Sequence, residues 1–166
     1  MNLQIESYLV KSKNFTFNKL TNNDELFVNI NNYQSIDKKL LDYDYLSGAL
    51  IIKYEGKELL GFKHWDLIDQ LWYYFVDAFI KLASDGKAEF SFPDQPFKVM
   101  MERKNNTFIS LNLNGNVFLL NEKDFITQML ISSNNFFMNL KKIFPEYEFD
   151  IDECIDKVKQ AEKIYK

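Results

Sequence analysis

One histidine, His64, is the only side chain in the sequence that could act as an imidazole base. A general base needs an orienting partner and, in nucleophilic catalysis, a nucleophile within hydrogen-bond reach. No serine or cysteine motif accompanies His64, and there is no glycine-rich phosphate loop or nucleophile elbow. His64 stands next to Trp65 where a helical pattern begins, so we expect it to cap that helix or to pack at its edge.

The single cysteine, Cys154, is the second candidate for chemistry. It falls with Ile151, Ile155 and Val158 on the apolar stripe of the final predicted helix, where a buried thiol is an inert small hydrophobe. One cysteine also excludes an intrachain disulfide framework and a cysteine-based zinc site. We therefore predict no metal ligands and no cofactor.

Two carboxylates, Asp66 and Asp77, share one face of the long predicted helix with Gln70 and Tyr73. Their separation of eleven residues corresponds to roughly 16 Å along a helix, whereas paired acid and base groups lie roughly 5 to 10 Å apart. We interpret this face as solvated. No catalytic residue is predicted, and an enzyme would need a site assembled from distant residues, such as His64 with an Asp or Tyr elsewhere.

An acidic segment near the C-terminus has the most functional content. It contains no lysine or arginine before Lys157, and its acids are Glu146, Glu148, Asp150, Asp152, Glu153 and Asp156. Part of this charge suits the N-terminus of a helix, and a solvated helix start is one interpretation. The other is a docking surface for a basic protein partner, with Tyr147 and Phe149 as aromatic anchors. The segment lacks the spacing and the central glycine of a calcium loop.

Composition limits the classes of partner. The chain of 166 residues is predicted to form one domain over residues 1–166, and 46% hydrophobic residues suffice for a core. A net charge of −4 and a single arginine, Arg103, argue against a nucleic-acid ligand. No signal peptide and no apolar stretch of membrane-spanning length is visible, so we expect no membrane partner and a cytoplasmic location. A secreted protein without disulfides stays an alternative.

Hydrophobic periodicity predicts an α+β fold with an antiparallel sheet of hairpins and a meander, one long central helix and two C-terminal helices packed on the sheet. The first forty residues alternate weakly and predict three short strands, around residues 3–9, 15–17 and 26–30, with Asn22-Asn23-Asp24 as a turn. Residues 47–62 predict a hairpin, and Asn114-Gly115 is the clearest turn of a meander over residues 88–120.

Helix boundaries follow from caps and breakers. The first long helix is predicted to begin at His64 and Trp65 and to end at Asp85-Gly86. Asn121 is predicted to cap the second helix, which Pro145 closes. The last helix is predicted to begin at Asp150, which with Glu153 is typical of a capping box.

The order of elements over residues 47–144 supports one resemblance. With Trp65 and Trp72 on the long helix, followed by Phe92-Pro93-Asp94-Gln95-Pro96, the chain resembles bacterial immunity proteins of polymorphic or contact-dependent toxin systems. The resemblance implies a non-enzymatic protein that binds and neutralises a cognate toxin domain, and it assigns no residue roles. The alternatives are a small enzyme or small-ligand protein and a homo-oligomeric structural protein; the oligomeric state and the partner's identity stay open.

Overall fold

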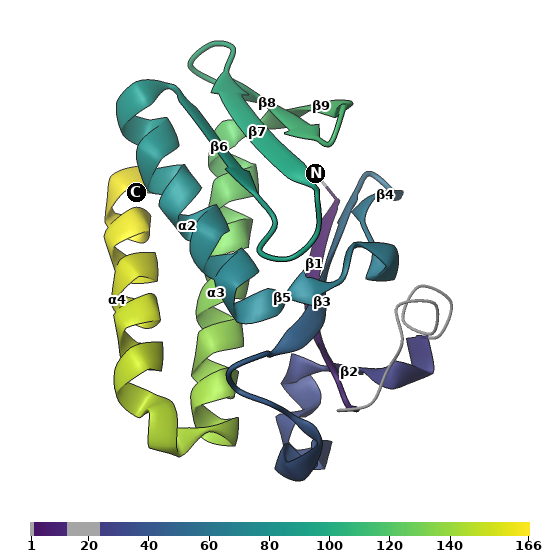
Figure 1. Cartoon of the computed structure of the whole chain (residues 1–166). Coiled ribbons are helices and arrows are strands. Elements are labelled where there is room, and N and C mark those ends of the chain that lie inside the picture. Colours follow the sequence, from purple (N-terminus) through teal and green to yellow (C-terminus); the bar gives the residue numbers. More distant parts are fainter. Residues whose placement is uncertain (1, 13–23) are drawn as a thin grey trace.

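The computed structural model describes residues 2–12 and 24–166, which form two antiparallel sheets and three long helices (Figure 1). The first sheet has the strand order β2-β1-β3-β4, with the short β5 also pairing with β3. Its strands are β1 (Leu3–Val10), β2 (Phe27–Asn29), β3 (Ser47–Tyr54), β4 (Lys57–Leu60) and β5 (Asp66–Leu67). The predicted α+β class is confirmed, but one predicted sheet is in fact two.

The second sheet is the predicted meander, in the order β6-β7-β8-β9. Its strands are β6 (Lys87–Ser91), β7 (Lys98–Arg103), β8 (Phe108–Leu113) and β9 (Asn116–Asn121). Asn114 and Gly115 join β8 to β9 with φ angles of 50° and 98°, as a type I′ turn requires. The expected strand near residues 15–17 and the expected turn at residues 22–23 lie outside the described residues.

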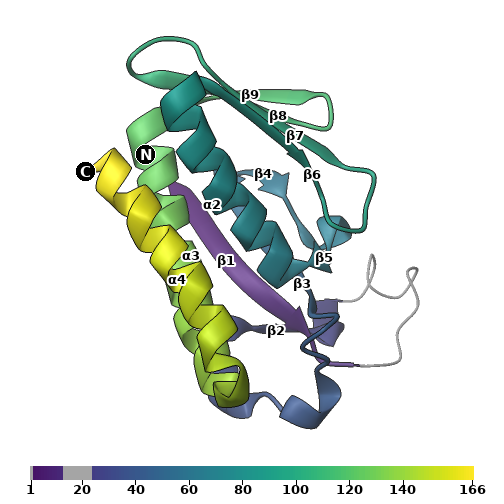
Figure 2. The same cartoon turned by 60° about the vertical axis from the view of Figure 1, so that its left-hand side comes forward.

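The helices are α2 (Ile68–Asp85), α3 (Glu122–Ile143) and α4 (Glu148–Tyr165). Both views show α2 running between the second sheet and α4 (Figures 1 and 2). Helix α2 contacts β3 and β6, α3 contacts β1 and β9, and α4 packs on both helices. Buried side chains from both sheets and all three helices therefore belong to one continuous apolar core. No helix in these ranges is both long and apolar enough to cross a membrane.

Two helix starts differ from the sequence prediction. Residues Phe62–His64 form a 3-10 turn, and Asp66 pairs with Gly48 of β3, so α2 begins at Ile68 and not at His64 or Trp65. Helix α4 begins at Glu148 after a 3-10 turn over Pro145–Tyr147, so Asp150 lies inside its first turn and does not cap it. The predicted N-cap Asn121 is confirmed, because its side chain accepts a hydrogen bond from the Asp124 N–H at 3.0 Å.

The solvated position predicted for Asp66 is wrong. Asp66 is fully buried, and its carboxylate accepts backbone N–H bonds from Leu67 at 2.7 Å and from Asp94 and Gln95 at 2.9 Å. Asp94 and Gln95 belong to the loop between β6 and β7, so Asp66 ties this loop of the second sheet to the first sheet. Burial still raises its pKa, although the three backbone N–H bonds oppose that rise.

Candidate functional site

The acidic segment lies on the 3-10 turn at Pro145–Tyr147 and on the first turns of α4, and we call residues 146–156 the acidic edge. Four of its six carboxylates pair with lysines of the same chain. Glu146 bonds to Lys38, and Lys141 binds both Glu148 at 2.6 Å and Asp152 at 2.9 Å. Asp156 contacts Lys159 at 3.0 Å. Hydrogen bonding holds the pKa of Glu146 below its usual value.

Two acids of the edge, Asp150 and Glu153, are exposed and have no ion pair among the described residues. The four paired carboxylates share three lysines, one of which serves two of them. Negative charge therefore remains on the edge after internal pairing, although much less than the sequence indicates.

The two predicted aromatic anchors occupy different environments. Tyr147 is half-buried, and its ring stacks on Tyr43 with centroids 3.7 Å apart and planes at 8°. This contact fixes the 3-10 turn before α4. Phe149 is 76% exposed, so its ring is the one available to a partner. A large exposed aromatic beside unpaired carboxylates fits the composition of protein interfaces.

A cavity of about 250 Å³ opens beside the acidic edge, between the N-terminal parts of α2 and α4, and we call it the α2–α4 cavity. Its lining combines aliphatic, aromatic and acidic side chains. The lining residues are Tyr43, Asp69, Gln70, Tyr73, Tyr74, Phe137, Leu140, Asp150, Ile151 and Cys154. Asp150 thus belongs both to the acidic edge and to the cavity, which makes the two one continuous site.

Asp69 is the unusual group in this cavity. Its Oδ1 exposes less than 1 Å² and has no hydrogen-bond partner among the described residues. Burial raises the carboxyl pKa from 3.8 to about 6, and the backbone N–H groups of Gln70 and of Asp69 itself oppose the rise. The sequence pattern placed Asp69 in the first turns of a helix, and nothing in that pattern indicates burial.

Two other groups of the cavity, Tyr43 and Cys154, stay protonated at neutral pH. Burial, with the charges of Asp150 and Asp69 adding to it, raises the pKa of Tyr43 to about 12. Burial and Asp69 raise the pKa of the Cys154 thiol to about 11. Cys154 is half-buried and borders the cavity, and its high pKa agrees with the inert thiol predicted from the sequence.

His64 lies away from the cavity, and its contacts are structural. Its Nδ1 accepts the Gly61 N–H at 3.0 Å, and its ring meets Phe97 edge-on with centroids 5.1 Å apart. Burial lowers its pKa, so the imidazole is neutral at pH 7. The packing role matches the expectation, whereas the cap belongs to the 3-10 turn Phe62–His64 and not to the long helix as expected. Within the described ranges, no group of three or more His, Cys, Asp or Glu side chains is placed to hold a metal ion.

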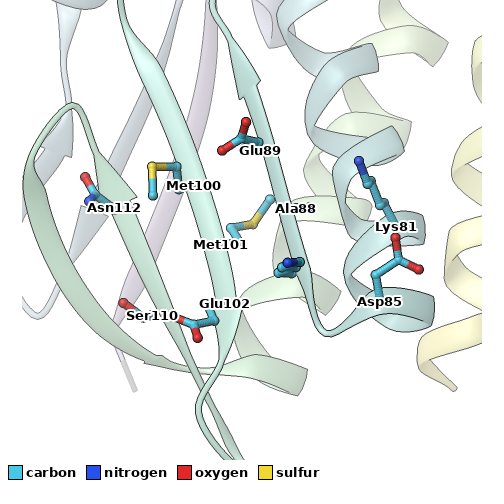
Figure 3. A pocket seen from close by; sticks show the side chains of 10 residues that line it. Lys81, Asp85, Ala88, Glu89, Met100, Met101, Glu102, Ser110 and Asn112 are labelled. Atoms are coloured by element: carbon cyan, nitrogen blue, oxygen red, sulfur yellow. The ribbon is translucent and has the colours of Figure 1, made fainter.

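The outer face of the second sheet is a further surface, which sequence reasoning did not single out. Four of its side chains are exposed and apolar: Met100, Phe108, Val117 and Leu119. Figure 3 looks onto this face, with Met100 of β7 between Glu89 of β6 and Asn112 of β8. A hollow of about 600 Å³ extends from these strands to Lys81 and Asp85 of α2.

Comparisons of the chain with protein-family models, with curated proteins and with solved structures gave no match. The resemblance to immunity proteins therefore stays a prediction, and the functional argument depends on the surfaces described above.

Proposed function

We propose that this chain is a non-enzymatic interaction protein, an immunity protein that binds and neutralises a cognate basic toxin domain through the acidic edge. The observation that carries the proposal is the juxtaposition of exposed Phe149 with Asp150 and Glu153, two exposed acids without ion pairs among the described residues. An aromatic anchor supplies buried contact area, and surrounding negative charge steers a basic partner into place.

The paired carboxylates of the edge support the same role. Lys38, Lys141 and Lys159 are exposed or partly exposed, so they can exchange partners when a more basic surface arrives. Surface ion pairs contribute only about 0–1 kcal/mol each, so opening them costs the complex little. The edge is therefore suited to contact a cationic surface without rearrangement of the backbone.

The test measures binding of the chain to the purified product of the adjacent gene. Reversal of Asp152, Glu153 and Asp156 to lysine is expected to weaken binding at least about tenfold and to reduce its salt dependence. A matched control reverses Asp85, Glu89 and Glu102, which give the same change of charge on α2 and the second sheet, and is expected to bind like the native chain. Equal affinity of the edge variant and the native chain contradicts the surface assignment, and no binding by the native chain contradicts the proposal.

A homo-oligomer is the second candidate, because the outer face of the second sheet exposes Val117 by 62% and Leu119 by 60%. Contiguous exposed apolar side chains mark interaction surfaces, and this face carries both signs of charge around them. Light scattering during size-exclusion chromatography checks it: a dimer that Val117→Lys and Leu119→Lys together convert to a monomer supports this candidate. A native chain that is monomeric at about 100 μM, well above common cellular concentrations, excludes it.

A further inference from the structure

The α2–α4 cavity is lined by Asp69, whose buried Oδ1 has no hydrogen-bond partner among the described residues. Burying a carboxylate without hydrogen bonds or a counter-charge is strongly unfavourable. Two lysines close to the lining residues are paired elsewhere: Lys157, which lies over the Tyr73 ring, pairs with Asp77 at 2.6 Å, and Lys141, next to Leu140 in sequence, binds Glu148 and Asp152. The half-buried Asp69 therefore has only the backbone N–H groups of Gln70 and of Asp69 itself, whereas the buried Asp66 accepts three N–H bonds.

The wall of the cavity is suited to an ammonium or guanidinium group. Tyrosines Tyr43, Tyr73 and Tyr74 line it, and a cation over an aromatic face gains about 0.5–2 kcal/mol. The chain already uses this interaction nearby, because the Lys157 Nζ lies 4.0 Å from the Tyr73 ring centroid. The aliphatic lining from Leu140 and Ile151 can contact the methylene groups of a long side chain.

The volume of the cavity and the carboxylate of Asp150 also fit a long cationic side chain. A volume of about 250 Å³ exceeds that of several water molecules, each of which occupies about 30 Å³, and so admits one extended side chain. Asp150 lies on the same cavity and is an exposed acid of the docking edge. A cation that enters from the edge therefore passes Asp150 before it reaches Asp69.

We infer that the α2–α4 cavity receives one lysine or arginine side chain of the partner, with Asp69 as its buried counter-ion and Asp150 at the entrance. This inference rests on the proposed function and deepens it, because it names the group of the partner that the site recognises. The Asp69 carboxylate then obtains on binding a counter-charge in addition to the backbone N–H groups of Gln70 and Asp69.

The experiment titrates the native chain at pH 7.5 with n-butylammonium and n-butylguanidinium, which copy the two side chains, and with 1-butanol as the uncharged analogue. Carboxyl carbon resonances of Asp69 and Asp150 report binding by nuclear magnetic resonance. Both cations are expected to give saturable shifts at millimolar concentration and to lower the pKa of Asp69. Butanol is expected to give no saturable shift at the same concentrations.

Two variants test whether Asp69 acts as a counter-ion or only fills space in the cavity wall. Asp69→Asn keeps the shape of the side chain and is expected to weaken cation binding at least about tenfold, or about 1.4 kcal/mol. Asp85→Asn, at the other end of the same helix, is expected to bind the cations like the native chain. Equal binding by Asp69→Asn, or equal binding of butanol, overturns the inference, since the cavity would then take any apolar ligand.

The two proposals fail in different ways. If reversal of the acidic edge abolishes binding of the partner while the native cavity gives no cation-dependent shifts, the counter-ion inference is wrong and the proposed function stands. If the cavity binds the cations while the partner's affinity is indifferent to the edge, the docking assignment is wrong. Loss of partner binding in Asp69→Asn, with a folded protein by circular dichroism, supports both.

Discussion

Asp66 and Asp69 are three residues apart, and each has a carboxyl pKa above its usual value. The two carboxylates differ in the hydrogen bonds that they accept. Asp66 accepts three backbone N–H bonds, which makes it a connector between β5 and the loop before β7. Asp69 keeps one buried oxygen without a hydrogen-bond partner among the described residues. The N–H bonds to Asp66 tie two elements together, whereas ionised Asp69 has one oxygen without such a bond and costs stability at neutral pH.

The pH dependence of that cost can be measured. The pKa of Asp69 rises from 3.8 in the unfolded chain to about 6 in the folded one, so the folded state binds the proton more tightly. The stabilisation is present below about pH 4 and is lost as the pH rises through about 6. Asp69→Asn is therefore expected to raise the free energy of unfolding by about 1–3 kcal/mol at pH 7.5 and to have little effect near pH 3.5, below the pKa of the unfolded chain.

Urea denaturation of the native chain and of Asp69→Asn at both pH values checks this expectation, with Asp85→Asn as the control. A variant that is less stable than the native chain at pH 7.5 would show that the carboxylate supports the fold. In that case a hydrogen bond to Asp69 exists in solution, and the argument for an uncompensated counter-ion fails.

Residue types alone indicated the roles of several side chains but not that of Asp69, the central residue of the α2–α4 cavity. The packing role of His64 and the inert thiol of Cys154 follow from their neighbours in sequence, whereas the 3-10 turn that His64 caps was not predicted. Asp69 could not be found in this way, because its burial arises when α4 and the segment around Tyr43 pack on α2. The pairing of Lys38 with the acidic edge could not be predicted either, since Lys38 is 108 residues from Glu146.

At the scale of elements, the turns and caps could be predicted from adjacent residues. The features that the sequence prediction missed depend on pairing between strands distant in sequence. The meander, the Asn114-Gly115 turn and the Asn121 cap follow from backbone preferences of a few adjacent residues. The start of α2 does not, because β5 takes Asp66 and Leu67 into pairing with Ser47 and Gly48 of β3. No sequence window that covers only the helix contains this information.

The crossing of β1, β3 and α2 depends on a glycine. A Cβ at Gly48 would lie 2.2 Å from the Tyr8 carbonyl oxygen and 2.7 Å from Cγ2 of Ile68. Gly48→Ala is expected to destabilise the chain by about 1–3 kcal/mol, because backbone atoms of β1 must move. Thermal unfolding measures this effect.

Gly61→Ala is the matched control for that substitution. Its Cβ would meet the end of the Glu58 side chain, which is flexible and can turn away. A small change for Gly61→Ala and a large one for Gly48→Ala is the expected result. If Gly48→Ala is as stable as the native chain, the close packing of β1 against β3 and α2 is looser than described.

For the whole molecule, the sequence predicted the fold class but not the division into two sheets. Turns and periodicity indicate which residues form strands. Which strands pair with one another, and where one sheet ends, also depends on the helices that pack between the sheets. Helices α2 and α3 each contact both sheets, so the apolar core is continuous although the hydrogen-bonded ladders are separate. The acidic edge and the outer face of the second sheet lie at different ends of this body (Figure 1).

The separate ladders have a consequence for the order of folding. Short turns join β6 to β9 in sequence order, whereas residues 11–46 separate β1 from its partner β3. Closing a longer loop costs more entropy, so contacts close in sequence form earlier. During refolding, pulsed hydrogen exchange is expected to protect amides of β7 and β8 before those of β1, and simultaneous protection would contradict this order. The strand at the start of the chain then joins its sheet after the meander has formed, so an early refolding species exposes the first sheet's unpaired edges.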